Sequence, residues 1–178
     1  KAKGAAFERQ VCQQLSLWIT RGARRDCFWR SAMSGGRATV GYARGRDHAR
    51  QAGDICAVAP EGHPLTTKYY IECKHLKTLR LDRFLLGGGP LMAIWVRACR
   101  EGHRYGRAPM LIVKQNGGKI LLLVGTDLVD PAADLGRPDF SATKPVAAVH
   151  VQSEEIHIYL FDAITRVPKA RQVSRRIA

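Results

Sequence analysis

The sequence predicts an α/β protein, a single domain in which helices flank a mixed central β-sheet. Apolar residues recur at helical spacing over residues 4–20, and a second helix, apolar on most sides, is predicted over 90–101. Two continuous apolar runs, 109–114 and 119–124, lie on either side of Asn116-Gly117, a pair that favours a tight hairpin turn. Continuous apolar runs are typical of central strands covered on both faces. We therefore expect the 90–101 helix to pack against the sheet.

The N-terminal part of the chain predicts a helix followed by two strands. The core stripe of the 4–20 helix consists of Phe7, Val11, Leu15 and Trp18. Residues 27–31 and 53–59 are expected to form strands. Between them lies a long loop, 32–52, that is rich in glycine and arginine.

A third strand is predicted over residues 66–75, which begin with a run of β-branched and aromatic residues. A hairpin-like pairing through the Pro60–Pro64 turn would set this strand beside 53–59. We then expect a short helix within 75–84 and a hinge or loop at 87–89. Gly102 is expected to close the helix that follows.

The C-terminal part predicts fewer regular elements. Residues 126–145 contain three prolines and look irregular, apart from a short helix near 127–134. Two further strands are expected at 146–151 and 155–161, and the basic segment 166–176 is expected to be a tail. We therefore divide the chain into a core, residues 1–125, and an extension, residues 126–178, that packs on this core.

Composition points to a globular protein with a polyanionic partner. The chain has 178 residues, 46% of them hydrophobic, which suits one domain with a substantial core. Its formal net charge is +14, and residues 1–100 carry eighteen Lys and Arg against seven acidic residues. Such an excess of positive charge favours a nucleic acid. No basic amphipathic helix, lipidation motif or long apolar run indicates a membrane.

The cysteines indicate a reducing compartment. There are five of them, an odd number, without the spacing of a metal site. We expect reduced and mostly buried thiols in a cytoplasmic protein, associated with the nucleoid, or located in the host cytoplasm if a phage encodes it.

Two carboxylates and one ammonium group form the candidate site. In the 66–75 strand, Glu72 and Lys74 share one face because side chains two residues apart point the same way, and His75 takes the other face. Asp54, at the start of the neighbouring strand, would lie beside Glu72. Mg²⁺ prefers such oxygen ligands, activates a water and neutralises charge on a phosphate, and a lysine can orient that water. This chemistry suits phosphodiester hydrolysis.

Each of these features also has a simpler, non-catalytic interpretation. The Glu-x-Lys pair occurs once among fifteen acidic residues, and a solvated edge strand explains it equally well. Glu8 lies at the border of the helical stripe, where a solvated glutamate is the simpler interpretation. The loop 32–52 is either a solvated loop or a phosphate-binding one, in which glycine permits close approach and arginine binds phosphate oxygens.

The order of these segments resembles the PD-(D/E)XK nuclease superfamily: a helix with Glu8, a strand ending in Arg30-Ser31, a strand with Asp54, then Glu72-Cys73-Lys74 and a helix. Lys3-Gly4-Ala5-Ala6-Phe7-Glu8-Arg9 is similar to the opening of the archaeal-type Holliday junction resolvases. The resemblance covers about residues 3–125. It implies a restriction-endonuclease-like core and an enzyme that cleaves DNA with Mg²⁺, for which Mn²⁺ can substitute.

The same resemblance implies a role for each matching residue. Asp54 and Glu72 would bind Mg²⁺ with the Cys73 carbonyl, Lys74 would position or activate the attacking water, and Glu8 would assist through a metal-bound water. Arg30 and Ser31 match a pair that lies near the scissile phosphate in those resolvases. The residues expected to bind DNA are Lys3, Arg30, Ser31, Arg37, Arg44, Arg46, Arg50, Lys77 and Arg80.

The sequence departs from the superfamily pattern at two places. Gly53 stands where the superfamily often has proline, and twenty-two residues separate Ser31 from Asp54, where the resolvases have a much shorter connection. The leading hypothesis is an endonuclease for four-way junctions or other branched DNA, with a homodimer as one arrangement. The alternatives are a nuclease for linear DNA in restriction, repair or phage DNA processing, a non-catalytic DNA-binding module, and an RNA-binding protein supported by charge alone.

Overall fold

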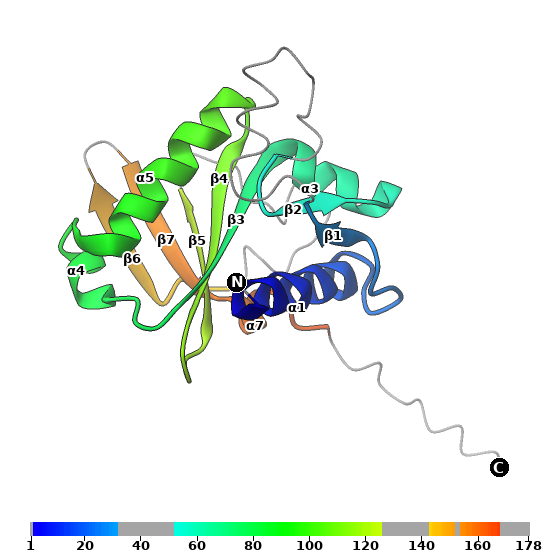
Figure 1. The fold of residues 1–178 in the computed structure, drawn as a ribbon, viewed down its shortest axis with the longest axis horizontal. Coiled ribbons are helices and arrows are strands. Elements are labelled where there is room, and N and C mark those ends of the chain that lie inside the picture. The colour runs from blue at the N-terminus through cyan, green and yellow to red at the C-terminus, as the bar shows by residue number, and fades with distance from the viewer. Residues whose placement is uncertain (1, 32–51, 126–142, 152–153, 168–178) are drawn as a thin grey trace.

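A five-stranded mixed sheet forms the centre of the fold (Figure 1). The structure is a computed structural model, and it describes residues 2–31, 52–125, 143–151 and 154–167. In spatial order the strands are β3 (Tyr69–Leu76), β4 (Ala108–Gln115), β5 (Ile120–Gly125), β7 (Glu154–Leu160) and β6 (Ala147–Val151). The β3–β4 pair is parallel and the other three pairs are antiparallel, so the predicted mixed sheet is confirmed.

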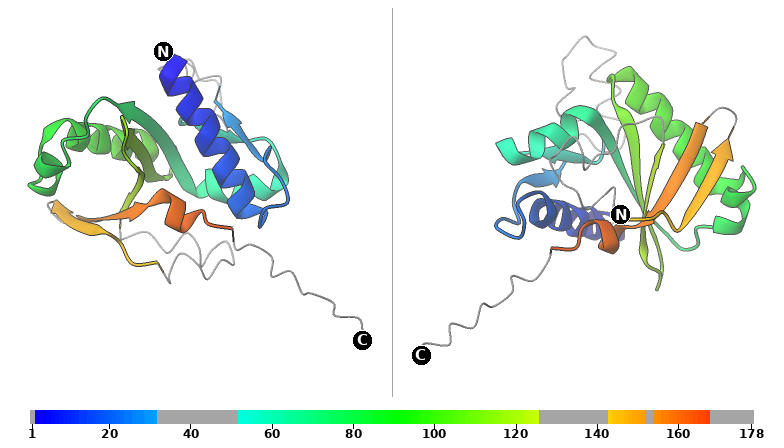
Figure 2. Two further views of the ribbon diagram at one scale, coloured as in Figure 1. Left: turned by 90° about the horizontal axis from the view of Figure 1, so that it is seen from below. Right: turned by 180° about the vertical axis from the view of Figure 1, so that it is seen from behind.

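Helices cover both faces of this sheet, as the apolar runs predicted. The helices that pack on it include α1 (Ala2–Ile19), α4 (Leu81–Leu85), α5 (Gly89–Arg104) and α7 (Phe161–Ile164). Figure 2 shows α1, in blue, and α5, in green, on opposite sides of β3. Successive residues of β4 point to opposite faces of the sheet. Ile112 packs in the hydrophobic cluster that contains α1, whereas Leu111 packs in the cluster that contains α5. The alternation follows from the two-residue period of a strand.

The α1 helix confirms the stripe predicted from its spacing. Phe7, Val11, Leu15 and Trp18 are all buried. The ring of Phe7 lies 5.5 Å from that of His75, which confirms that His75 occupies the α1 face of β3. Glu72 and Lys74 therefore project from the other face of β3, toward α5.

A small antiparallel ribbon packs beside the main sheet and carries the segment around Asp54. It pairs β1 (Phe28–Arg30) with β2 (Ile55–Ala57), in agreement with the strands predicted at 27–31 and 53–59. A 3₁₀ turn, η2 (Pro60–Gly62), and a short helix, α3 (His63–Lys68), connect β2 to β3.

This connection corrects two expectations. Residues 66–68 are helical rather than extended, because Pro64 suits the first turn of a helix and the Thr66 hydroxyl binds the carbonyls of the preceding turn. The hairpin through 60–64 is also wrong: β2 pairs with β1, and a helix occupies the intended turn. Asp54 reaches β3 by another route, described below.

The α5 helix differs from its prediction at its end and in its burial. It continues to Arg104, and Gly102 lies inside it rather than closing it. A Cβ at Gly102 would lie 2.6 Å from the Arg107 carbonyl oxygen, so only glycine lets the helix pass this close to the Arg107 backbone. Val96 and Arg97 are exposed, so α5 buries one face and is not apolar on most sides. The predicted helix near 127–134 lies outside the described residues.

Strands β6 and β7 come from the predicted C-terminal extension, and they pair into the same sheet as β5. Phe161 and Ile164 of α7 then pack in the cluster that holds α1. Within the part of the chain that the structure describes, no helix is long and apolar enough to span a membrane.

Candidate active site

Asp54 contacts the edge strand β3 of the main sheet through two hydrogen bonds. Its N–H donates to the Ile71 carbonyl oxygen at 2.8 Å. Its carboxylate oxygen Oδ2 in turn accepts the Cys73 N–H, also at 2.8 Å. Since β3 is the first strand of the sheet, its outer edge has backbone groups for both bonds. Asp54 and Glu72 are thus brought together without strand pairing between β2 and β3.

Gly53 makes this approach possible. Its φ is +89°, a conformation that side chains rarely adopt, and a Cβ on it would lie 2.7 Å from the Ile71 carbonyl oxygen. The departure from the superfamily's proline therefore has a structural reason. Proline requires a φ near −65° and does not fit here. A backbone lying directly against β3 needs glycine.

Replacing Gly53 with alanine should destabilise the protein more than the same change at Gly117. Gly117 also has a positive φ, +68°, but a Cβ there would meet no atom within 4 Å, so only backbone strain of about 1–2 kcal/mol is expected. At Gly53 the contact with backbone should add roughly 1–3 kcal/mol. Urea unfolding of the two variants tests the difference. Equal losses of stability would show that Gly53 is not needed for the close approach.

The Lys74 ammonium lies where three oxygen atoms converge. Its Nζ is 2.6 Å from Glu72 Oε1, 3.4 Å from Asp54 Oδ2 and 3.2 Å from the Cys73 carbonyl oxygen. Both carboxylate side chains are 8% exposed, and Lys74 is 28% exposed. These are the three oxygens that the sequence proposed as metal ligands. A cation already lies among them.

Burial and like charge shape the electrostatics of this group. Burial, together with the nearby Glu72 carboxylate, raises the pKa of Asp54 from 3.8 to about 6, although Lys74 and the Cys73 N–H act against the rise. Burial alone would lower the pKa of Lys74, but the Asp54 and Glu72 carboxylates outweigh it and raise that pKa. The lysine is therefore a fixed positive charge beside two carboxylates that repel each other.

Arg97 is a part of the site that sequence reasoning missed. Its Nη2 donates to Glu72 Oε1 at 2.8 Å from α5, so a second cation holds the same oxygen as Lys74. The Tyr70 hydroxyl lies 3.5 Å from the other oxygen, Glu72 Oε2. The available signal was a cation in the 90–101 helix, which was expected to pack against the sheet. Two cations offset the two carboxylates of Asp54 and Glu72.

Glu8 and Arg30 flank this group from the side of α1. Arg30 Nε donates to Glu8 Oε2 at 2.5 Å, which links α1 to β1. The next residue, Ser31, is buried, and its N–H donates to the Asp54 carbonyl oxygen at 2.9 Å. The Glu8 carboxylate is near enough to contribute to the raised pKa of Asp54. The structure thus brings Glu8, Arg30 and Ser31 beside the group formed by Asp54, Glu72 and Lys74.

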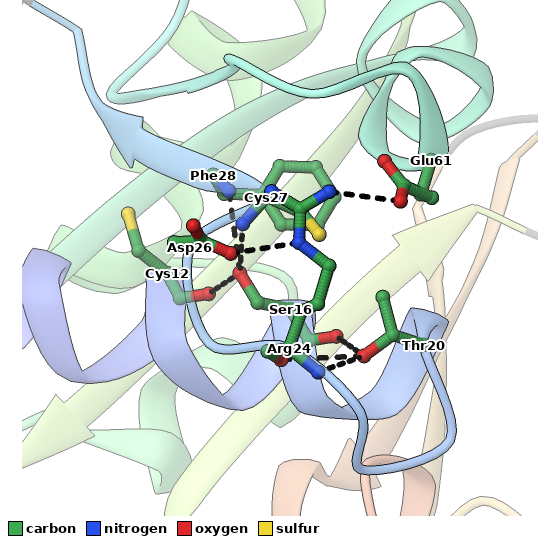
Figure 3. Close-up of polar contacts among 8 residues, drawn as sticks. All are labelled: Cys12, Ser16, Thr20, Arg24, Asp26, Cys27, Phe28 and Glu61. Carbon is green, nitrogen blue, oxygen red and sulfur yellow. Dashed lines mark hydrogen bonds and ion pairs between the residues drawn. The ribbon is translucent and has the colours of Figure 1, made fainter.

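Side-chain hydroxyls of α1 hold the loop that precedes β1 (Figure 3). The buried Ser16 hydroxyl accepts the N–H groups of Cys27 and Phe28 at 3.0 and 3.2 Å and donates to the Cys12 carbonyl at 2.7 Å. The Thr20 hydroxyl accepts the Arg24 N–H at 2.9 Å. These bonds satisfy buried backbone groups and set where β1 starts relative to α1.

The other residues predicted to bind DNA lie elsewhere or outside the described part. Lys3 donates a hydrogen bond to Asn116. Lys77 is exposed just after β3, and Arg80 pairs with Asp82 at 2.9 Å. The four loop arginines, Arg37, Arg44, Arg46 and Arg50, fall outside the described residues.

The donor set suits a hard divalent cation. Mg²⁺ commonly binds one or two carboxylates together with water and phosphate oxygens, and Asp54, Glu72 and the Cys73 carbonyl supply oxygens of this kind. Among the residues that the structure describes, no group of three His, Cys, Asp or Glu side chains could hold a metal ion. Two side chains and one carbonyl are the candidate ligands.

Comparison with known protein families gives a match over almost the whole chain. A family model described as "Phage putative PDDEXK endonuclease" matches residues 1–173. The match confirms the PD-(D/E)XK resemblance, and it extends beyond the region 3–125 on which the sequence patterns lay. No curated protein and no solved structure matches the chain.

Proposed function

The chain belongs to this phage PDDEXK endonuclease family, and we propose that it hydrolyses DNA phosphodiester bonds with Mg²⁺ bound by Asp54, Glu72 and the Cys73 carbonyl. The observation that carries the proposal is the convergence of these three oxygens around Lys74 Nζ. Two carboxylates and one backbone carbonyl are oxygen ligands of the kind that Mg²⁺ binds, and they already lie close to one positive charge.

When bound, the metal supplies a water of lowered pKa and neutralises charge on the phosphate. The protein's own residues do the rest. Lys74, which contacts the same oxygens, would keep its positive charge beside the attacking water, orient it and stabilise negative charge in the transition state. Arg97 would keep Glu72 in place through its ion pair when Lys74 contacts the water instead of the Glu72 carboxylate. Arg30, fixed by Glu8, would offer its remaining N–H groups to a phosphate next to the cut.

Branched DNA, in particular a four-way junction, is the substrate that we propose. The support is the Arg30-Ser31 pair and the Lys3–Arg9 segment, which are similar to those of junction resolvases, and the Arg30–Glu8 contact beside Asp54. Paired cuts in a junction need two active sites, so a homodimer belongs to this proposal. Mn²⁺ is expected to replace Mg²⁺, because both accept carboxylate and carbonyl oxygens.

Cleavage of a labelled four-way junction and of a linear duplex with the same arm sequence tests this substrate, each with Mg²⁺ and with EDTA. We expect symmetric cuts in the junction, with Mg²⁺ only, at concentrations that leave the duplex intact. Equal cutting of both substrates would instead assign the enzyme to linear DNA. Tight binding of both without any cutting, in Mg²⁺ or Mn²⁺, would indicate a non-catalytic module.

A further inference from the structure

A pocket of about 420 Å³ opens between α1 and β1, and Arg30 is one of its lining residues. Ligand pockets commonly fall in the range of about 300–1,000 Å³, so this one can take a group the size of a nucleotide. Its lining consists of Arg9, Cys12, Gln13, Arg25, Asp26, Phe28, Trp29 and Arg30.

Trp29 supplies an aromatic surface to this pocket. It is 64% exposed, whereas the other two tryptophans of the chain, Trp18 and Trp95, are each 2% exposed. In β1, Phe28 points into the core and Trp29 points outward, as the alternation of a strand requires. An indole left in water at the rim of a pocket is well suited to stack on a planar ligand.

The charge of the pocket is positive on balance. Asp26 is paired with Arg24 at 2.9 Å, and Arg30 with Glu8. Neither Arg9 nor Arg25 forms an ion pair with another residue in the described ranges, and both are exposed. Two guanidinium groups beside an indole are suited to an anion attached to a flat ring.

Arg30 connects the pocket to the candidate active site. Its side chain lines the pocket and binds Glu8, and the N–H of the next residue, Ser31, binds the Asp54 carbonyl. The Ser16 bonds shown in Figure 3 fix the start of the same strand to α1. Arg30 thus lies both in the lining of the pocket and against Glu8, the carboxylate that contributes to the raised pKa of Asp54.

We propose that the pocket receives an unpaired nucleotide of the DNA substrate, with its base stacked on Trp29 and its phosphate held by Arg9 and Arg25. This rests on the proposed function, since it adds a contact to the same substrate. A paired base is stacked within the duplex and offers no free face, so only an unpaired or flipped base can fill the pocket. Stacking on aromatic side chains tolerates any base. The pocket thus favours DNA with single-stranded character next to the cut.

Trp29 reports directly on this contact because it is the one tryptophan of the three that is exposed. The test measures acrylamide quenching of tryptophan fluorescence in EDTA, so that no DNA is cut. The protein is saturated, as judged by anisotropy of labelled DNA, with either a thymidine oligonucleotide or a blunt duplex of equal length. We expect the single strand to shield Trp29 from acrylamide and the duplex to leave it accessible. Trp29→Phe should remove the quenchable signal in both cases.

Affinity gives a second readout with a matched control. Trp29→Ala should weaken binding of the single strand by about 5- to 150-fold, the usual effect of losing one stacked base, and leave duplex binding unchanged. Trp29→Phe should restore most of the affinity. Val58→Ala, at an exposed apolar residue outside the pocket, should have no effect.

Either of two results would overturn the proposal. One is a saturated complex with the single strand in which Trp29 remains as accessible to acrylamide as in the free protein. The other is a Trp29→Ala variant that loses affinity equally for both DNAs. Neither measurement depends on cleavage, so a failure of the nuclease proposal would appear separately, as intact DNA in Mg²⁺.

Discussion

Replacing Lys74 with alanine is expected to lower the rate of DNA cleavage by about 10²- to 10⁴-fold, the range for loss of a group that orients or activates the reacting water. The reason is local. Lys74 is the cation that touches Asp54, Glu72 and the Cys73 carbonyl at once, and its raised pKa keeps it charged at neutral pH. DNA affinity should change little, because one half-buried lysine is a small part of a charge of +14.

Lys114→Ala is the matched control. Lys114 lies in the register position beside His75, so it projects from the α1 face of the sheet, away from the carboxylates. Single-turnover cleavage rates and DNA-binding anisotropy are measured for both variants, with circular dichroism to verify folding. If Lys74→Ala cleaves DNA within about threefold of the wild-type rate, the loss is far below that of a catalytic group, and Lys74 has no role in the chemical step.

Replacing Asp54 with asparagine is expected to stabilise the metal-free protein at neutral pH while abolishing cleavage. The pKa of Asp54 is about 6 in the folded protein and 3.8 is its ordinary value, so the folded state binds more protons between these two pH values. Stability therefore falls as the pH rises from about 4 to about 6, and the full cost, about 3 kcal/mol, is present above that range.

Asparagine removes this charge and keeps an oxygen that can accept the Cys73 N–H. In EDTA, the wild-type protein should lose stability between pH 4 and 6, and Asp54→Asn should lack that loss. Asp82→Asn is the control, since Arg80 lowers the pKa of this exposed aspartate and its removal should leave the loss in place. Urea unfolding at intervals of pH gives the free energies. An identical pH profile for Asp54→Asn and wild type would contradict the assigned burial and charge.

Metal binding to Asp54 and Glu72 should change the thermal stability of the protein. A divalent cation that binds the folded protein stabilises it by mass action, so Mg²⁺ or Mn²⁺ should raise the unfolding temperature of the wild type at pH 7. Asp54→Asn should show a much smaller rise, because it has lost one of two carboxylate ligands.

The alternation within β3 and the stripe on α1 were predictable from sequence, because each depends only on the period of one element. Glu72 and Lys74 share a face of β3, and Phe7 and Val11 are buried, as their spacing requires. The route by which Asp54 joins them was not predictable. Periodicity indicates which face a residue takes but not which strand lies beside it, and a helix replaced the expected turn.

Two other features of the site depend on how separate elements cross. Arg97 reaches Glu72 only because α5 packs over that face of β3, and Gly53 is required only because its backbone lies against Ile71. Neither contact has a local pattern in the sequence. Arg30 and Glu8 are intermediate cases: the resemblance to known nucleases indicated both, and their ion pair emerged from the packing of α1 against β1.

The most direct test of the central claim compares cleavage of one labelled branched DNA by the wild type and by Glu72→Gln, each in Mg²⁺ and in EDTA. Glutamine preserves the size of the side chain and removes the charge that Lys74 and Arg97 hold. We expect cutting only by the wild type with Mg²⁺, and equal DNA binding by both proteins. Cutting in EDTA, or by Glu72→Gln at the wild-type rate, would contradict a metal-dependent nuclease site built on Asp54, Glu72 and Lys74.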